Sequence, residues 1–516
     1  MSNTYNYKRK IFHYPMNINY KIDTTIKDAN YESSSNKLLI NNNLKLKKKN
    51  YNIFENNLIV HNINSFLTLR EFKNIKQTCK ILNLISTEKI NINEYHIENE
   101  HDYNYLIFHN NIEIKLFYIH INIDYNKLFS KNININILYL YFNNIFNQQL
   151  KPNFLPKSLK YLFINNFNQP LEHNILPKII TLIANNFNHP LKEYILPDSL
   201  INLDLNNFNQ VLQPNSLPKS LTHLSMNKFD QILQYNILGE SIETNTLIPQ
   251  KYRVEQNILP KSLIRLAFNN FNQPLTYNIL SNSLTYLSIN KFNQILQPNI
   301  LPNSLIFLSI NKFNQVLQPN VLPKSLIHLS MNNFNQILQL DILPKSLIHL
   351  SINKFNQILQ LDILPKSLIH LVLDSFNNIL QPDILPNSLT HLTMVKFNQI
   401  LLPNILPNSL TYLTMSNFNQ ILQPNILPDS LITLVLVMFN QPLKPNDLPN
   451  SLSKLQLYSY NYQLEQNILP NLLLELFLYD YNHPLLDNVL PKSLIYLKLD
   501  NFNQVLQTSV LPNLLV

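Results

Sequence analysis

Hydrophobic and polar residues recur with a fixed period of 21 residues from about residue 137 to the C-terminus. Each unit opens with a proline that follows a leucine, and a period kept for so long predicts a repeat protein whose units stack on one another. The prolines in this register are Pro197, Pro218, Pro260, Pro302, Pro323, Pro344, Pro365, Pro386, Pro407, Pro428, Pro449, Pro470, Pro491 and Pro512. Ser281 and Gly239 take the same place in two units, and a one-residue deletion leads back to Pro177 and Pro156.

The unit from Pro344 to Leu364 reads PKSLIHLSINKFNQILQLDIL, and positions are numbered here from its proline. Leu350 and Ile352, at positions 7 and 9, alternate with polar residues at positions 6, 8 and 10, which is the period of a short strand with one buried face. The leucine spacing matches the strand segment of a leucine-rich repeat. Prolines at position 1 and at position 18 of several units exclude a helix from the return path. We therefore expect a mostly β, leucine-rich-repeat-like solenoid with a parallel sheet.

Two residue types that recur after the strand predict how the units fit together. Phenylalanine holds position 12 in most units, and we expect these rings to stack as an aromatic spine. Asparagine at position 13 is expected to turn inward and bond backbone groups that the turn leaves unpaired; it occurs as Asn293, Asn314, Asn335, Asn356, Asn398 and Asn419. The chain has a single glycine, Gly239, so left-handed backbone positions must fall mostly to Asn or Asp.

Positions 6, 8 and 10 vary between units while the buried positions do not, which marks them as the exposed face of the sheet. Aromatic side chains dominate protein interfaces, so the row at position 6 is a candidate protein-binding face. The alternative is that these side chains form cross-strand ladders that only support the sheet. The candidate residues are Arg265, Tyr286, Phe307, His328, His349, His370, His391, Tyr412, Lys454 and Tyr496.

The four histidines of this row should form a ladder with steps of about 5 Å. A straight ladder cannot surround a metal ion tetrahedrally, so no metal site is predicted. Crowded imidazoles repel one another once they are protonated, so the ladder predicts a stability that falls below about pH 6.

Composition argues against most other classes of function. One glycine leaves no phosphate-binding loop and no glycine-rich nucleophile elbow, and the acidic residues do not converge, so we expect neither an enzyme nor a cofactor. Cys79 is the only cysteine, which excludes an intramolecular disulfide and a cysteine-based zinc site. The first 30 residues hold no secretory signal and no stretch approaches 18 apolar residues, so an intracellular protein without a membrane span is expected.

The N-terminal part of the chain differs from the repeats. Residues 1–50 carry most of the basic runs, Lys8–Lys10 and Lys45–Lys49, in a chain of net charge +9. They predict either a partly disordered, solvated arm or a nuclear-localisation or nucleic-acid patch. The repeats lack the interleaved Arg and aromatic residues of a nucleic-acid surface, so nucleic acid is the weaker interpretation. Residues 91–136 are expected to be an irregular linker or N-terminal cap, with irregular strands or decayed repeats. Within the solenoid, residues 239–259 form a degenerate unit without the Phe-Asn pair, interpreted as a hinge or as simple drift.

The segment Phe292-Asn293-Gln294-Ile295-Leu296-Gln297-Pro298 resembles the core of the FNIP repeat, and the resemblance covers residues 137–516. That family is known from social amoebae and from giant DNA viruses that infect amoebae. The resemblance therefore implies a protein-interaction solenoid in an amoebal host, in the cytoplasm or the nucleus. Here the third residue of the motif is mostly Gln where the family has Ile.

Many FNIP proteins carry an F-box before their repeats, and residues 51–90 are similar to one. Two amphipathic helices are expected there, with candidate ligase-adaptor contacts at Leu58, Ile59, Ile63, Phe66, Leu67, Leu69 and Phe72. Glu55-Asn56-Asn57 stands where the usual Leu-Pro opening should be. The resemblance implies a substrate receptor that recruits a host cullin–RING ubiquitin ligase. The alternative is a plain repeat scaffold in which these helices only cap the solenoid.

Overall fold

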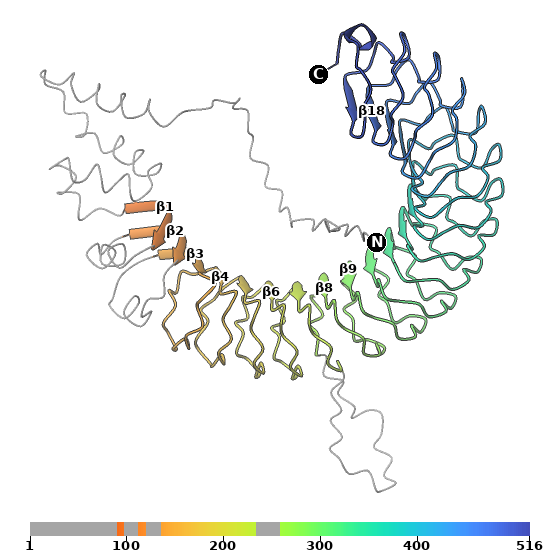
Figure 1. The fold of residues 1–516 in the computed structure, drawn as a ribbon. Helices are drawn as coiled ribbons and strands as arrows, with labels where there is room; N and C mark the ends of the chain where they lie inside the picture. The colour runs from red at the N-terminus through yellow and green to blue at the C-terminus, as the bar shows by residue number, and fades with distance from the viewer. Residues whose placement is uncertain (1–89, 98–111, 120–135, 234–257, 516) are drawn as a thin grey trace, which may run out of the picture. The chain divides into compact units, whose positions relative to one another are not determined.

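A computed structural model of the chain divides into two units, residues Met1–Asn62 and Ile63–Val516. It describes residues 90–97, 112–119, 136–233 and 258–515, all of which lie in the second unit. These residues form one parallel sheet with turns and extended return segments (Figure 1). The strands are β1 (Ile90–Ile97), β2 (Ile112–Ile119), β3 (Asn136–Phe142), β4 (Tyr161–Phe163), β5 (Thr181–Ile183), β6 (Asn202–Asp204), β7 (His223–Ser225), β8 (Arg265–Ala267), β9 (Tyr286–Ser288), β10 (Phe307–Ser309), β11 (His328–Ser330), β12 (His349–Ser351), β13 (His370–Val372), β14 (His391–Thr393), β15 (Tyr412–Thr414), β16 (Thr433–Leu436), β17 (Lys454–Leu457), β18 (Glu475–Leu478) and β19 (Tyr496–Leu499).

Each strand pairs with the equivalent residues of the next unit. Leu329 of β11 lies opposite Leu350 of β12, and Leu350 lies opposite Leu371 of β13, so partners are 21 residues apart. The predicted parallel β-solenoid is therefore confirmed. Besides strands and turns, the described residues contain one short 3-10 helix, η3 (Thr508–Val510). The helices expected within residues 51–90 lie almost wholly outside the described residues.

The sheet begins earlier in the chain than the repeat motif. β1 and β2 are eight residues long and pair in parallel with each other, and β2 pairs with β3 through Phe117 opposite Leu140. Both strands fall in the region of residues 91–136 that the sequence suggested to be a linker or cap. Their inward residues Ile114 and Phe117 are fully buried and join the same core as the later repeats.

The sheet also runs without interruption past the degenerate unit. β7 pairs directly with β8, with Leu224 opposite Leu266, so stacked partners are here 42 residues apart. The ring of Phe229 stacks on that of Phe271 with centroids 6.3 Å apart. Residues 234–257, which include most of this unit, lie outside the described residues.

Burial follows the repeat. In the unit that starts at Pro344, Leu347, Ile352 and Phe355 are 0% exposed and Leu350 is 2% exposed. The equivalent side chains of all units form one continuous core, because a single unit is too thin to bury its own apolar faces and needs a neighbour on each side.

The predicted aromatic spine is confirmed. Rings at position 12 stack nearly parallel from unit to unit; the centroids of Phe334 and Phe355 are 6.4 Å apart with planes 2° apart. Tyr460 and Tyr481 replace phenylalanine in two late units and keep the same stacking distance. At position 6, by contrast, the rings of His328 and His349 are only 4.1 Å apart. Neighbouring units are therefore closer together at the strand face than at the spine, and they fan out away from that face.

The residues with left-handed backbone are mostly Asn and Asp, as the composition predicted. Among the described residues, every residue with positive φ occupies position 19 of its unit and is Asn or Asp, except Tyr194 with φ of 58°. Asp341 and Asp362 are examples, with φ of 58° and 60°. Asn and Asp tolerate this region best after glycine, so the expectation is confirmed.

The asparagines of position 13 form a ladder between units. The backbone N–H of Asn356 donates to Oδ1 of Asn335 at 2.8 Å, and Nε2 of Gln357 donates to the same oxygen at 3.2 Å. The expected bonds to backbone groups are confirmed. The expected inward orientation is wrong, because Asn335 is half-buried and Asn356 is exposed. The phenylalanine at position 12 fills the interior, and the next residue lies at the surface.

Replacement of Leu350 by alanine should lower the free energy of unfolding by about 2–5 kcal/mol, because it leaves a cavity between two units. Urea denaturation followed by circular dichroism measures the change. Ile358, which is 71% exposed, provides the control: its replacement by alanine should change stability by less than about 0.5 kcal/mol. Equal effects of the two substitutions would contradict the assigned core.

Asn335→Ala should cost about 0.5–1.5 kcal/mol, because the N–H of Asn356 loses its acceptor at a position that water can reach. Asn335→Asp is the matched control, since Asp230 occupies the same position in another unit and accepts the N–H of Asn272 at 2.8 Å. The aspartate variant should retain most of the stability in the same denaturation measurement. A loss as large as that of the alanine variant would argue against the ladder.

Candidate protein-binding face of the sheet

Parallel pairing places the predicted face residues in one row. Phe307 lies opposite His328, and His328 lies opposite His349. The same register brings His370, His391 and Tyr412 into line on the following strands. The side chains at position 6 are thus neighbours in space although they are 21 residues apart in sequence.

The row is a continuous stack of flat groups. The guanidinium carbon of Arg265 lies 4.1 Å from the ring centroid of Tyr286, and that ring lies 4.4 Å from Phe307. Phe307 and His328 are tilted, with centroids 5.9 Å apart. The remaining steps are 4.1 Å for His328–His349, 4.3 Å for His349–His370, 4.2 Å for His370–His391 and 5.6 Å for His391–Tyr412.

Exposure along the row is intermediate. Arg265 is exposed, while the residues from Tyr286 to Tyr412 are half-buried because each ring covers its neighbours. Position 8 is less accessible than expected. Ser288 and Ser309 are buried, and the hydroxyl of Ser288 donates to Oδ1 of Asn269 at 2.9 Å. The expectation that position 8 belongs to the exposed face of the sheet is therefore wrong for these units, because serine is short and is held by the asparagines at position 10.

Lys454 and Tyr496 belong to the same row but are separate from the stack. Thr433 lies between Tyr412 and Lys454. Nζ of Lys454 lies 2.5 Å from a carboxylate oxygen of Glu475, which in turn precedes Tyr496 in the row. The C-terminal part of the face thus consists of the ion pair between Lys454 and Glu475 and of Tyr496, which is 43% exposed.

A second aromatic row at the N-terminal end was missed. His96, Tyr118, Tyr141 and Phe163 stack across β1 to β4 with centroids 4.5, 4.5 and 4.1 Å apart. They sit two residues after the position-6 column, which holds Tyr139 and Tyr161. The alternation in Tyr139-Leu140-Tyr141 was the sequence signal for this row. The row could not be followed to His96 and Tyr118 from the sequence, because the register of β1 and β2 was not known.

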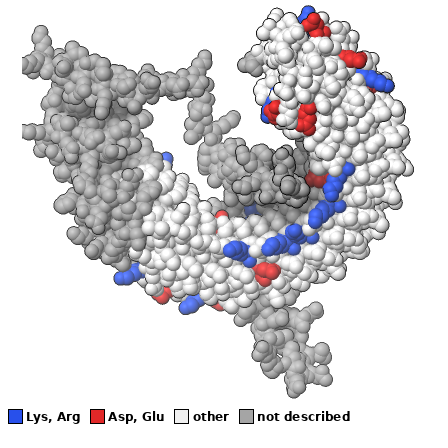
Figure 2. Space-filling model, in the orientation of Figure 1, with Lys and Arg blue, Asp and Glu red and all other residues white. Residues whose placement is uncertain are grey.

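A row of lysines at position 11 was also missed. Lys228, Lys291, Lys312, Lys354 and Lys396 are all exposed, and Figure 2 shows basic side chains following one another along the solenoid. With the asparagines of position 13 they line two adjoining hollows that share Lys312, of about 440 and 520 Å³. We call this surface the lysine groove. The recurrence of lysine one residue before the Phe-Asn pair was the sequence signal.

Burial and stacking change the proton affinity of the histidines. The pKa of His349 is lowered to about 4, first by burial and second by the neighbouring imidazoles of His328, His370 and His391. The pKa values of these three neighbours are also lowered, mainly by burial. The ladder is thus neutral at pH 7, and protonation is opposed first by desolvation and second by repulsion.

The recurrent polar side chains of the described residues have structural partners. In this part of the chain no three His, Cys, Asp or Glu side chains are placed to hold a metal ion. The serines of position 3 bond to backbone; the hydroxyl of Ser346 donates to the carbonyl of Leu326 at 2.7 Å. None of the described segments is a helix with the length and apolar character to cross a bilayer. The predicted ligase-adaptor contacts, Leu58 to Phe72, lie outside the described residues.

Comparison with known proteins agrees with this architecture. The model of the FNIP repeat matches residues 125–167, 187–229, 253–291, 271–313, 313–354, 355–396, 397–436, 439–480 and 481–516. None of the curated proteins matches the chain. Among solved structures, CroV588, described as a circular leucine-rich-repeat protein, is 36% identical with a TM-score of 0.60. That match covers 78% of this chain and 65% of CroV588, so the chain spans about two thirds of that protein's length.

Two more distant matches are found among the solved structures. YopM from Yersinia enterocolitica is 22% identical, with a TM-score of 0.44, and the match covers 78% of this chain and 86% of YopM. The mouse RP105/MD-1 complex contains a chain that is 16% identical, with a TM-score of 0.44, and 74% of this chain and 66% of that chain are covered.

The lowered pKa values of the histidines predict a stability that depends on pH. Below the ordinary pKa of about 6.5 the unfolded chain binds protons that the folded ladder resists. The free energy of unfolding should therefore fall as the pH falls from 6.5 toward 4. Asp204 has the opposite effect on stability. Burial raises its pKa from 3.8 to about 6, although a hydrogen bond from Ser225 opposes the shift. The folded state therefore binds this proton more readily than the unfolded chain, which favours folding as the pH falls.

A double variant separates the contribution of the histidines from that of Asp204. His349→Phe with His370→Phe removes two titrating groups and keeps aromatic stacking, as Phe307 does in the same row. Urea midpoints measured at about pH 7.5 and pH 5 should fall less in the variant than in the unaltered chain. Equal losses in both proteins would contradict the role of the ladder.

Proposed function

The chain belongs to the FNIP repeat family, and we propose that it is a non-catalytic scaffold that binds a target protein on the strand face of its solenoid. The observation that supports this most is the stacked row from Arg265 to Tyr412. Tyr and Arg are the residues that most often dominate binding energy at protein interfaces.

The row is suited to binding in two respects. It crosses eight consecutive strands, β8 to β15, which at about 4.8 Å per strand gives a length of roughly 34 Å. Each ring is held between its neighbours, so little side-chain entropy is lost when a partner contacts it. A long, preorganised and half-apolar row favours a protein partner over a small molecule.

The second part of the proposal concerns a ubiquitin ligase. We propose that residues 51–90 recruit the adaptor of a host cullin–RING ligase, which would make the chain a substrate receptor. The support is the F-box-like pattern of Leu58, Ile59, Ile63, Phe66, Leu67, Leu69 and Phe72. The competing function is a plain scaffold with no ligase link. The absence of the Leu-Pro opening before Leu58 favours this alternative.

Affinity capture from amoebal lysate with the full chain tests both parts. Tyr286→Thr, Phe307→Thr and His349→Thr together interrupt the stack between Arg265 and His370, and threonine already occupies this position as Thr433. This face variant should lose its target while it still captures cullin and adaptor. Deletion of residues 50–90 should lose cullin and adaptor and retain the target.

A control variant, Ile358→Thr with Ile379→Thr, alters two side chains that are 71% and 67% exposed on another row. It should capture the same proteins as the unaltered chain. Target capture that survives in the face variant would contradict the binding face. Absence of cullin and adaptor from every capture would leave the plain scaffold as the function.

A further inference from the structure

The lysine groove is a second surface, distinct from the strand face, and its shape is fixed by the solenoid. The backbone N–H of Lys312 donates to the carbonyl of Asn290, and that of Lys354 to the carbonyl of Asn332, both at 2.8 Å. Every lysine of the row is anchored in this way to the preceding unit. The amines therefore project from fixed points along the solenoid.

The groove offers mainly hydrogen-bond donors. Lysine has three donors and no acceptor. Asn314 and Asn335 line the groove, and their Oδ1 atoms accept the N–H of the next unit at 2.8 Å. The amide orientation is thereby set, so Nδ2 remains as a donor, and no bond from Nδ2 of Asn314 or Asn335 to another described residue is present. A partner that fits must supply acceptors.

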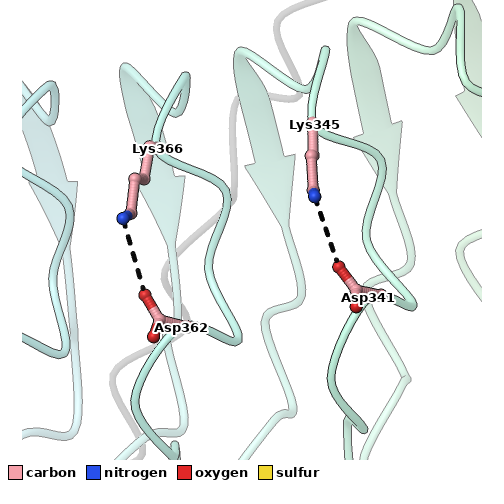
Figure 3. A network of polar contacts seen from close by, with 4 residues as sticks. All are labelled: Asp341, Lys345, Asp362 and Lys366. Atoms are coloured by element: carbon pink, nitrogen blue, oxygen red, sulfur yellow. Dashed lines mark ion pairs between the residues drawn. The ribbon is translucent and has the colours of Figure 1, made fainter.

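The charges of the groove are not compensated within the described part of the chain. None of its five lysines forms an ion pair with a described residue, although Asp230 lines the end near Lys228. Two of the lysines at position 2 differ from them. Nζ of Lys345 lies 3.6 Å from Asp341, and Nζ of Lys366 lies 3.8 Å from Asp362 (Figure 3). The five lysines of the groove therefore offer a partner a row of positive charge that the described acidic residues do not neutralise through ion pairs.

We propose that the lysine groove binds an extended acidic segment of a partner polypeptide. Lys312, Lys354 and Lys396 are each two units apart. With about 4.8 Å per unit at the strands and 6.4 Å at the adjoining spine, two units measure roughly 10–13 Å. An extended chain rises about 3.3 Å per residue. Carboxylates at every third or fourth residue therefore match these amines.

The lining favours a polypeptide over a nucleic acid. Proteins that bind single strands combine a basic groove with aromatic side chains on which bases stack. The residues that line this groove are Lys, Asn, Ser and Asp, with no aromatic residue and no arginine to grip phosphate. Carboxylates spaced along a flexible chain can reach single amines without stacking, so the acidic polypeptide is the better match.

Fluorescence anisotropy with the full chain and labelled peptides tests the proposal. One peptide carries Glu at every third residue among Ser and Thr, and a matched peptide carries Gln in place of Glu. The groove variant combines Lys312→Asn, Lys354→Asn and Lys396→Asn, and Asn333 is a native occupant of the same position. The control variant combines Lys324→Asn, Lys345→Asn and Lys366→Asn, which removes the same charge from position 2, where Asn303 is a native occupant.

The Glu peptide should bind at about 50 mM salt and weaken at higher salt, and the Gln peptide should not bind. The groove variant should lose about tenfold in affinity, or about 1.4 kcal/mol, while the control variant binds as the unaltered chain does. Circular dichroism of both variants verifies that they fold. Equal losses in the two variants, or no binding of the Glu peptide, would overturn the proposal. So would a single-stranded oligonucleotide that binds more tightly and is lost in the groove variant.

Discussion

Hydrogen bonding between equivalent positions of successive units is the constraint on which the whole structure depends. A unit is one strand thick, so its backbone groups and apolar faces are satisfied only by a neighbour that presents the same groups at the same height. The strand pairing of Leu329 with Leu350 and the bond from the N–H of Asn356 to Asn335 express this requirement on two sides of the unit. The requirement concerns equivalent positions rather than a fixed number of residues, since Leu162 pairs with Leu182, and the N–H of Asn188 bonds to Asn168, across 20 residues.

The same constraint explains the unusual composition. Each unit must turn through a left-handed residue at position 19, and with almost no glycine the chain uses Asn or Asp there in nearly every unit. Rings at position 12 keep neighbouring units about 6.4 Å apart, whereas paired strands hold them closer. The core therefore widens away from the sheet, and large aromatic side chains fill the wider part.

A unit can stack on another unit that has the same pattern of buried residues, even when that unit does not follow it directly in the sequence. β7 closes directly onto β8 across 42 residues, and the spine continues from Phe229 to Phe271. Both proposed binding surfaces follow from this property, since any side chain that recurs at one position becomes a row. The strand face and the lysine groove are two such rows, and they differ only in which position of the unit carries them.

The sequence by itself determined the unit, its strand, the aromatic spine, the use of Asn and Asp in left-handed turns and the position-6 row, because a strict period fixes which residues become neighbours. It could not determine how deeply each outward position is buried. Ser288 is hidden by its bond to Asn269 while the rings beside it stay accessible, and Asn335 lies at the surface rather than inside. It indicated irregular strands within residues 91–136 but not their pairing, because their spacing departs from 21 residues, and it missed the lysine groove. Those features depend on distances between side chains of different units, and only the packing of one unit against the next sets these distances.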